Sequence, residues 1–278
     1  MTALFDDKAV RAHLSRAARQ KDAPDFLWKH LGTALAERLL DIRRTFDTVL
    51  EIAPQGLVTS PKIKSKKRLA PEPVSIWPLE ENSLDALISL GHLHWDNDPV
   101  GSLIQFRRAL KPDGLFLGAL FGGETLYELR EAIAAAEMEI LGGVSPRLSP
   151  FATLPDMAGL MQRAQFALPV VDGEKITVTY KNLTALVADL RGMGQTHAAA
   201  KRDRRILPKA FWPKVEEIYR ARSTTEDGRL KATVEVFYLL GWCPDASQPK
   251  ALKPGSAKAR LSDALKTVEI GTGDFTKN

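Results

Sequence analysis

Apolar residues spaced three and four positions apart run through residues 8–40 and predict a pair of N-terminal helices. The spacing is clearest at Phe26, Leu31 and Leu35, and Asp25 lies where a helix N-cap is expected. This stretch therefore predicts a helical extension in front of the main domain.

Short apolar runs predict the strands of a sheet. Residues 48–52 (TVLEI), 84–90 (LDALISL) and 115–121 (LFLGALF) are too brief for helices and have the look of buried strands. Residues 99–110 form an amphipathic helical pattern, and Lys-Pro-Asp-Gly at 111–114 predicts a turn after it. The order strand, helix, turn, strand is typical of a parallel sheet with helices on its faces.

The second half of the chain adds further helices and strands. Helices are predicted at 124–141, 153–164, 182–191 and 208–221. Residues 168–171 and 175–180 are predicted to form a hairpin joined by Asp172 and Gly173, and 232–242 a final strand. We therefore expect an α/β fold with N-terminal helices at 1–45, a mixed-sheet domain at 46–243 and a flexible tail at 244–278.

The composition is that of an ordinary soluble protein. Among the 278 residues, 44% are hydrophobic and 26% charged, which is close to the average of soluble globular proteins. A chain of this length can bury a substantial apolar core. The single cysteine, Cys243, fits a reducing compartment. Acidic residues near Met1 and the lack of an 18-residue apolar run predict cytoplasmic residence without membrane insertion.

Five cations cluster in the middle of the chain, although the net charge is only +5. They are Lys62, Lys64, Lys66, Lys67 and Arg68. No aromatic residues are interleaved with them as stacking platforms, so a solvated loop is favoured over a nucleic-acid site.

Several motifs match known families. The segments are 78–87 (PLEENSLDAL), 93–98 (LHWDND), 110–114 (LKPDG), 121–130 (FGGETLYELR), 142–151 (GGVSPRLSPF) and 189–194 (DLRGMG). The first three resemble class I S-adenosylmethionine-dependent methyltransferases. The last three resemble the methyltransferase-like assembly factor of respiratory complex I and its bacterial relatives, and the resemblance covers nearly the whole chain.

The resemblance implies a Rossmann-like methyltransferase sheet, an S-adenosylmethionine pocket and a protein substrate or partner. It also implies arginine hydroxylation as one activity, because the mitochondrial member is understood to hydroxylate an arginine rather than to methylate. Glu51, Ala53 and Gly56 occupy the positions of the cofactor loop. Ala53 and Gln55 replace the expected glycines, and Pro54 removes a backbone donor, so the loop argues against cofactor binding.

The segment after this loop is short for the implied fold. Only 33 residues separate Glu51 from Asp85, whereas a single βαβ unit takes about 30 residues and the pattern calls for two crossovers. Prolines throughout residues 57–83 oppose a regular helix, so we expect a shortened first crossover. Glu72 is the candidate acid for the ribose hydroxyls of the cofactor.

His94 and Trp95 follow a predicted strand and are expected to line the cofactor pocket, because sites form beyond the carboxyl ends of parallel strands. The alternation of His92, His94, Asp96 and Asp98 also has the spacing of a metal site. We favour the pocket-lining interpretation and assign no metal.

Six further polar residues in the specific motifs are candidates for substrate or partner contact. They are Glu124, Tyr127, Arg130, Arg147, Asp189 and Arg191. The alternative interpretation is structural: some of these side chains would be favoured by a helix dipole, and others would form surface ion pairs that contribute little to stability. Two functions follow: a methyltransferase-like enzyme acting on a protein, with no catalytic residue assigned, or a pseudo-methyltransferase that binds a partner and assists assembly of a complex.

Overall fold

The computed structural model describes residues 3–249, 263 and 265–268. Residues Met1–Asp245 form one compact unit and Ala246–Asn278 a second. The predicted tail at 244–278 therefore falls largely outside the described residues. Within the part that is described, no helix combines the length and apolar character needed to cross a bilayer.

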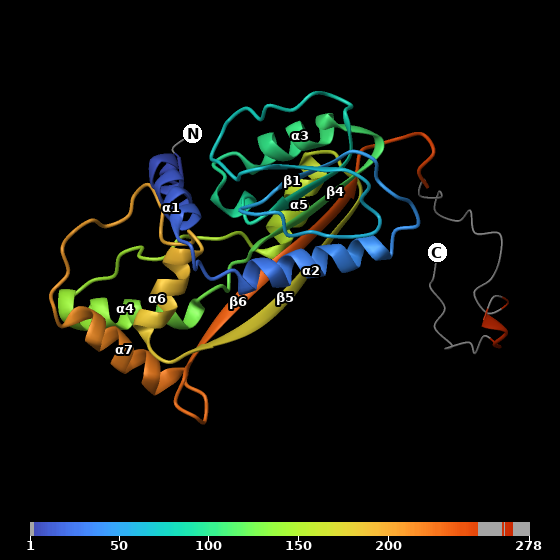
Figure 1. Cartoon of the computed structure of the whole chain (residues 1–278). Helices are drawn as coiled ribbons and strands as arrows, with labels where there is room; N and C mark the ends of the chain where they lie inside the picture. Colours follow the sequence, from blue (N-terminus) through green and yellow to red (C-terminus); the bar gives the residue numbers. More distant parts are fainter. Residues whose placement is uncertain (1–2, 250–262, 264, 269–278) are drawn as a thin grey trace, which may run out of the picture. The chain divides into compact units, whose positions relative to one another are not determined.

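The first unit is built on one six-stranded sheet (Figure 1). Its strands are β1 (Val49–Ile52), β2 (Lys66–Leu69), β3 (Leu84–Leu90), β4 (Leu110–Phe121), β5 (Ala167–Tyr180) and β6 (Leu230–Trp242). The spatial order is β2-β1-β3-β4-β6-β5. Strands β2, β1, β3 and β4 are parallel to one another, while β6 runs antiparallel to both β4 and β5. The predicted α/β fold with a mixed sheet is confirmed.

Helices cover both faces of the sheet and gather at one end of β5 and β6 (Figure 1). They are α1 (Asp7–Arg19), α2 (Phe26–Leu40), α3 (Pro99–Ala109), α4 (Tyr127–Leu141), α5 (Leu154–Arg163), α6 (Leu183–Gly192) and α7 (Phe211–Arg222). Helix α2 packs on one face, and α3 and α5 pack on the other. Helices α4, α6 and α7 form a third apolar cluster with β5 and β6.

The alternation of side chains along β3 and β4 builds the two faces. Ile88 and Leu117 contribute to the cluster under α2, whereas Leu87 and Phe116 contribute to the cluster under α3 and α5. Successive residues of a strand point to opposite sides, so an unbroken apolar run fills both layers. The prediction of buried parallel strands is confirmed by this arrangement.

The first crossover is shortened, as predicted. After β1 the chain passes through turns and irregular backbone and reaches β2 without an intervening helix. The connection from β2 to β3 also lacks a helix. Strand β2 itself was not predicted: the lysine cluster, interpreted as a solvated loop, forms part of this edge strand, with Val49 opposite Lys66.

One predicted turn is wrong, and a second lies inside a strand. Asp172 and Gly173 do not close a hairpin: they lie inside the continuous strand β5, opposite Tyr238 and Phe237 of β6. Residues 111–114 do not precede a strand but bulge out within β4, because pairing with β3 begins at Leu110 and then shifts register. At Asp172 and Gly173, pairing with a neighbouring strand overrides the local turn signal. At 111–114 the chain still bends locally, with Asp113 at φ of +56°.

Candidate functional site

A cleft of about 630 Å³ lies at the carboxyl ends of β1 and β2. Helices α1 and α2 form one side of it, and the loop after β1 and residues 68–72 form the other. Pro54, Gln55 and Glu72 line it, so the predicted cofactor loop and the candidate ribose acid meet at one place. This is the position at which open parallel sheets bind their ligands.

Glu51 lies beneath the loop and is completely buried. Its Oε1 accepts hydrogen bonds from the backbone N–H groups of Leu57 (2.8 Å) and Val58 (2.9 Å). Its Oε2 pairs with Lys66 Nζ of β2 at 2.6 Å. The carboxylate therefore holds the loop and the edge strand together, and the two N–H groups are directed at it rather than at the cleft.

Arg68 occupies the rim of the loop. Its Nη1 donates to the carbonyl oxygens of Ala53 (3.1 Å) and Pro54 (3.2 Å). Glu72 has an exposed side chain, and its backbone carbonyl accepts a hydrogen bond from His92 Nε2 at 3.1 Å. The cleft is thus bordered by charged side chains of both signs, and Gly56 remains exposed beside it.

Trp28 of α2 covers the carboxyl end of β3. The backbone of Gly91 has φ of +70°, and a β-carbon there would lie 2.6 Å from Trp28 Cζ3. Trp28 also packs on Phe121, with ring centroids 5.5 Å apart. Only glycine permits this contact at this backbone conformation.

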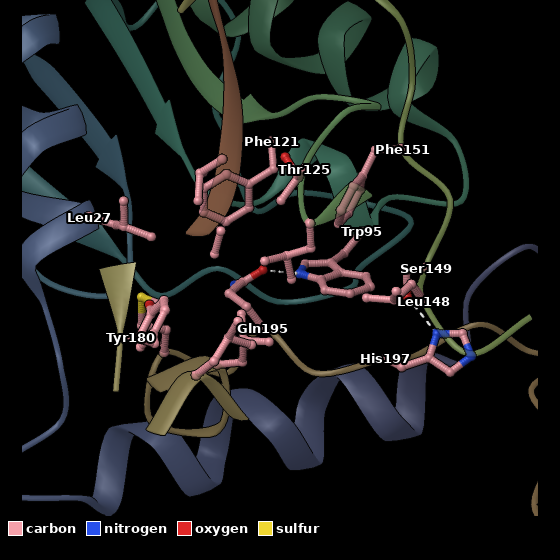
Figure 2. Close-up of a pocket in the computed structure, with 16 residues that line it drawn as sticks. Leu27, Trp95, Phe121, Thr125, Leu148, Ser149, Phe151, Tyr180, Gln195 and His197 are labelled. Atoms are coloured by element: carbon pink, nitrogen blue, oxygen red, sulfur yellow. Dashed lines mark hydrogen bonds between the residues drawn. The ribbon is translucent and has the colours of Figure 1, made fainter. Parts of the chain in front are cut away.

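His94 and Trp95 lie in a different place from the cleft. Trp95 lines a second, mostly apolar cavity of about 40 Å³ between the sheet, α2 and α6 (Figure 2). His94 Nε2 and Trp95 Nε1 both hydrogen-bond Gln195 Oε1, each at 2.8 Å. Burial lowers the pKa of His94 to about 3, so its imidazole is neutral at physiological pH.

The alternating histidines and aspartates do not converge. His92 contacts the Trp77 ring edge-on, while Asp98 caps α3 by accepting from the Gly101 N–H. Among the described residues, no group of three or more potential ligands could hold a metal ion.

The residues of the FGGETLYELR motif have separate surroundings. Glu124 pairs with Lys175 at the surface, and Tyr127 is exposed at the first turn of α4. Arg130 Nη2 donates to the carbonyls of Gly123 and Thr125. Helix α4 therefore begins later than predicted, and Glu124 precedes it.

Arg147 is part of a buried ion-pair network. Its Nε lies 2.6 Å from Oε1 of the fully buried Glu137, and its Nη2 lies 2.9 Å from Asp203. Burial raises the pKa of Glu137, but hydrogen bonds from Ser145 and the Arg147 charge outweigh it and hold the pKa below its usual value. Arg147 also lines a surface pocket of about 650 Å³ together with Arg130.

Asp189 and Arg191 on α6 are apart from that network. Asp189 hydrogen-bonds the Tyr180 hydroxyl, and burial raises the pKa of both groups. Arg191 borders a groove between α6 and α7 that also contains Trp212. The six residues predicted to contact a substrate or partner are therefore distributed over several surfaces.

The sequence analysis did not single out Ser149, Gln195 or His197, which all line the second cavity. Ser149 Oγ lies 3.0 Å from His197 Nδ1, and His197 Nε2 donates to the Pro146 carbonyl. Ser149 falls inside the GGVSPRLSPF motif, and Gln195 directly follows DLRGMG. These uncharged residues of the motif segments, and not the charged ones beside them, line the cavity.

Comparison with known proteins adds to this picture. A model described as a methyltransferase domain matches residues 33–118. Arginine-hydroxylase NDUFAF5, mitochondrial, from Danio rerio is 33% identical over 295 residues, spanning 96% of this chain and 91% of that protein. Malonyl-[acyl-carrier protein] O-methyltransferase from Laribacter hongkongensis (strain HLHK9) is 32% identical over 291 residues, spanning 91% and 95% respectively.

The structure of the YcgJ protein of Bacillus subtilis aligns with 78% of this chain, and the alignment covers 99% of YcgJ. It does so with 12% identity and a TM-score of 0.47. Both sequence relatives span nearly the full length of the chain. The parallel core of the sheet agrees with the methyltransferase description of the matching domain model and of the second relative. The chain therefore belongs to the class I S-adenosylmethionine-dependent methyltransferase superfamily, in the family of the NDUFAF5 arginine-hydroxylases.

Proposed function

We propose that this protein is a pseudo-methyltransferase that binds a partner protein and assists the assembly of a respiratory or other complex. The observation that carries the proposal is the state of the loop after β1, whose N–H groups at Leu57 and Val58 are bound to Glu51. In the family pattern, glycines at this loop permit close approach of the backbone to the cofactor.

Three features support the loss of cofactor binding. Ala53 and Gln55 stand where glycines permit close approach, and Pro54 has no N–H to donate. The chain leaves the loop toward β2 without a helix, so this loop does not lead into a helix N-terminus as in the family pattern. Arg68 also donates hydrogen bonds to the backbone carbonyl oxygens of Ala53 and Pro54 in this loop. These residues do not fit the cofactor.

The second candidate is an enzyme that modifies a protein side chain, as the name of the arginine-hydroxylase relative suggests. The open cleft of about 630 Å³ favours it, because that volume falls within the range of small-molecule sites. In this case Glu72, with its exposed carboxylate on the cleft, is the residue proposed to hold the ribose.

Calorimetric titration of the full chain with S-adenosylmethionine and S-adenosylhomocysteine tests the proposal. We expect no heat of binding at millimolar ligand, because Ala53 and Gln55 stand where glycines would permit close approach of the backbone to the cofactor. The malonyl-[acyl-carrier protein] O-methyltransferase of Laribacter hongkongensis, titrated in the same buffer, serves as the positive control.

Micromolar binding of either ligand would overturn the pseudoenzyme and favour the second candidate. Glu72→Gln would then be expected to weaken binding about tenfold, a loss of about 1.4 kcal/mol. The matched control is Glu80→Gln, an exposed glutamate of the same irregular segment that does not line the cleft.

For the partner surface, we propose Glu124 and Tyr127 near the start of α4, Arg130 in the surface pocket, and Arg191 in the groove between α6 and α7. Cytoplasmic residence belongs to the same proposal. The mitochondrial location printed for the relatives is a property of those proteins.

A further inference from the structure

The cavity in Figure 2 is lined mainly by apolar side chains, among them Leu27, Phe121, Phe151 and Val234. It measures about 40 Å³, which is room for a few non-hydrogen atoms. Leu148, together with Ser149 and Phe151, is shared with the surface pocket that contains Arg130. A short group at the end of a longer chain could therefore reach the cavity from that pocket.

Most polar side chains that line the cavity have their hydrogen bonds made. The Thr125 hydroxyl bonds to the backbone of β6. Ser149 Oγ accepts from the N–H of Ala198 and donates to His197 Nδ1. The Tyr180 hydroxyl bonds to Asp189 outside the lining. These groups leave little unused hydrogen-bonding capacity for a ligand.

Gln195 is different. Its Oε1 accepts from Trp95 Nε1, and an indole N–H can only donate, so the amide oxygen must face Trp95. His94 Nε2 donates to the same oxygen. The amide cannot be flipped without breaking both bonds. Its Nε2 is consequently fixed on the other side, where it is buried and has no partner among the described residues.

A buried amide donor without a partner is costly, so its persistence in a formed cavity calls for an acceptor. A single water would need two to four polar partners to be held there. Other side chains that line the same cavity, such as Leu27, Phe121 and Tyr180, are apolar or already bonded. A ligand atom that accepts a hydrogen bond and is carried on an apolar group fits better.

We infer that this cavity binds a short neutral acyl group, whose carbonyl oxygen accepts a hydrogen bond from Gln195 Nε2 while its carbons contact the apolar wall. A thioester, an ester and an amide side chain share this chemistry. A guanidinium group carries only hydrogen-bond donors, so its N–H groups would face the N–H donor of Gln195. The cavity therefore discriminates against an arginine side chain. The inference does not depend on cofactor binding in the cleft.

Titration of the ¹⁵N-labelled full chain, followed by the side-chain amide signal of Gln195, tests this inference. The probes are S-methyl thioacetate, N-methylacetamide, methylguanidinium and dimethyl sulfide. We expect saturable downfield shifts of the amide protons with the two carbonyl probes. Affinity for methylguanidinium and for dimethyl sulfide should be at least tenfold weaker. The relative affinity of the two carbonyl probes distinguishes a thioester from an amide ligand.

Two variants separate hydrogen bonding from space. Gln195→Glu keeps an acceptor for Trp95 and His94 but replaces the donor, and should weaken both carbonyl probes at least tenfold. Because this variant has no side-chain amide at position 195, its titration is followed by the backbone N–H signals of the lining residues Thr125 and Val234. Ala232→Leu fills the cavity while leaving Gln195 in place, and should do the same. Gln162→Glu, an exposed glutamine of α5, is the matched control and should bind like the wild type.

Near-ultraviolet circular dichroism establishes that each variant is folded, and the wild-type titration stands even if a variant is not. The inference is overturned if methylguanidinium binds as well as the carbonyl probes. It is equally overturned if no probe gives a saturable shift and the Gln195 amide contacts only water.

Discussion

Glu51→Ala is expected to lower the free energy of unfolding by about 3–5 kcal/mol, as for other broken buried ion pairs. The substitution leaves the N–H groups of Leu57 and Val58 without their acceptor and removes the partner of Lys66. Because Glu51 is completely buried and Lys66 largely so, solvent can replace these interactions only if the loop opens. Urea unfolding followed by circular dichroism measures the loss.

Two further variants make this prediction specific. Glu51→Gln retains an oxygen for the two N–H groups but loses the charge opposite Lys66, so its loss should be intermediate. Glu80→Ala, at an exposed position, should change stability by no more than about 0.5 kcal/mol. A loss of less than about 1 kcal/mol for Glu51→Ala would contradict the role assigned to the carboxylate.

Acidification to about pH 5 is expected to destabilise the protein by about 2 kcal/mol through His94 alone. Burial lowers its pKa from 6.5 to about 3 in the folded state, so between these values only the unfolded chain takes up the proton. The stability is fully present above pH 6.5 and is lost as the pH falls toward about 3. Each pKa unit of this gap contributes about 1.4 kcal/mol.

Urea unfolding at about pH 7.5 and about pH 5 measures this effect. His94→Gln supplies the comparison, because its amide can donate to Gln195 without titrating. Its loss on acidification should be smaller than that of the wild type by about 2 kcal/mol. Burial also lowers the pKa of His92, so some acid sensitivity should remain in the variant. Equal losses in the two proteins would refute the prediction.

The sequence was sufficient for the elements whose pattern and surroundings agree. Strands β1 and β3 are short apolar runs, and burial on both faces is what such runs encode. Helix α5 has its start encoded locally, because Thr153 and Asp156 form a reciprocal capping box. In these places neighbouring residues alone determine the outcome.

Elsewhere distant partners decided the structure. Asp172 and Gly173 have the composition of a turn, yet β6 pairs with β5 along its whole length and keeps them extended. Strand β2 is too rich in lysine to be recognised, but charged residues are common on edge strands, where they discourage pairing with other chains. Lys66 moreover has its charge matched by Glu51 of the adjacent strand.

The candidate sites show the same limit. Glu72 lines the same cleft as Pro54 and Gln55 of the loop, because both segments follow strands that end at one edge of the sheet, and its role toward the ribose stays a prediction. Gln195 could not be singled out, since its fixed orientation depends on Trp95, a hundred positions earlier in the chain. The orientation of this neutral amide, and the unpaired donor that results from it, depend on His94 and Trp95, which only the fold brings close to it.

The long antiparallel pair of β5 and β6 bears on how the chain folds. The two strands are separated in sequence by α6 and α7, and together they contribute to the cluster under α2 and to the cluster of α4, α6 and α7. Such non-local pairing is slow to form, because the chain loses the entropy of loop closure before the stabilising contacts between the strands are made. Once formed, the ribbon joins both clusters, so they should gain hydrogen-exchange protection as one cooperative unit and in a late step.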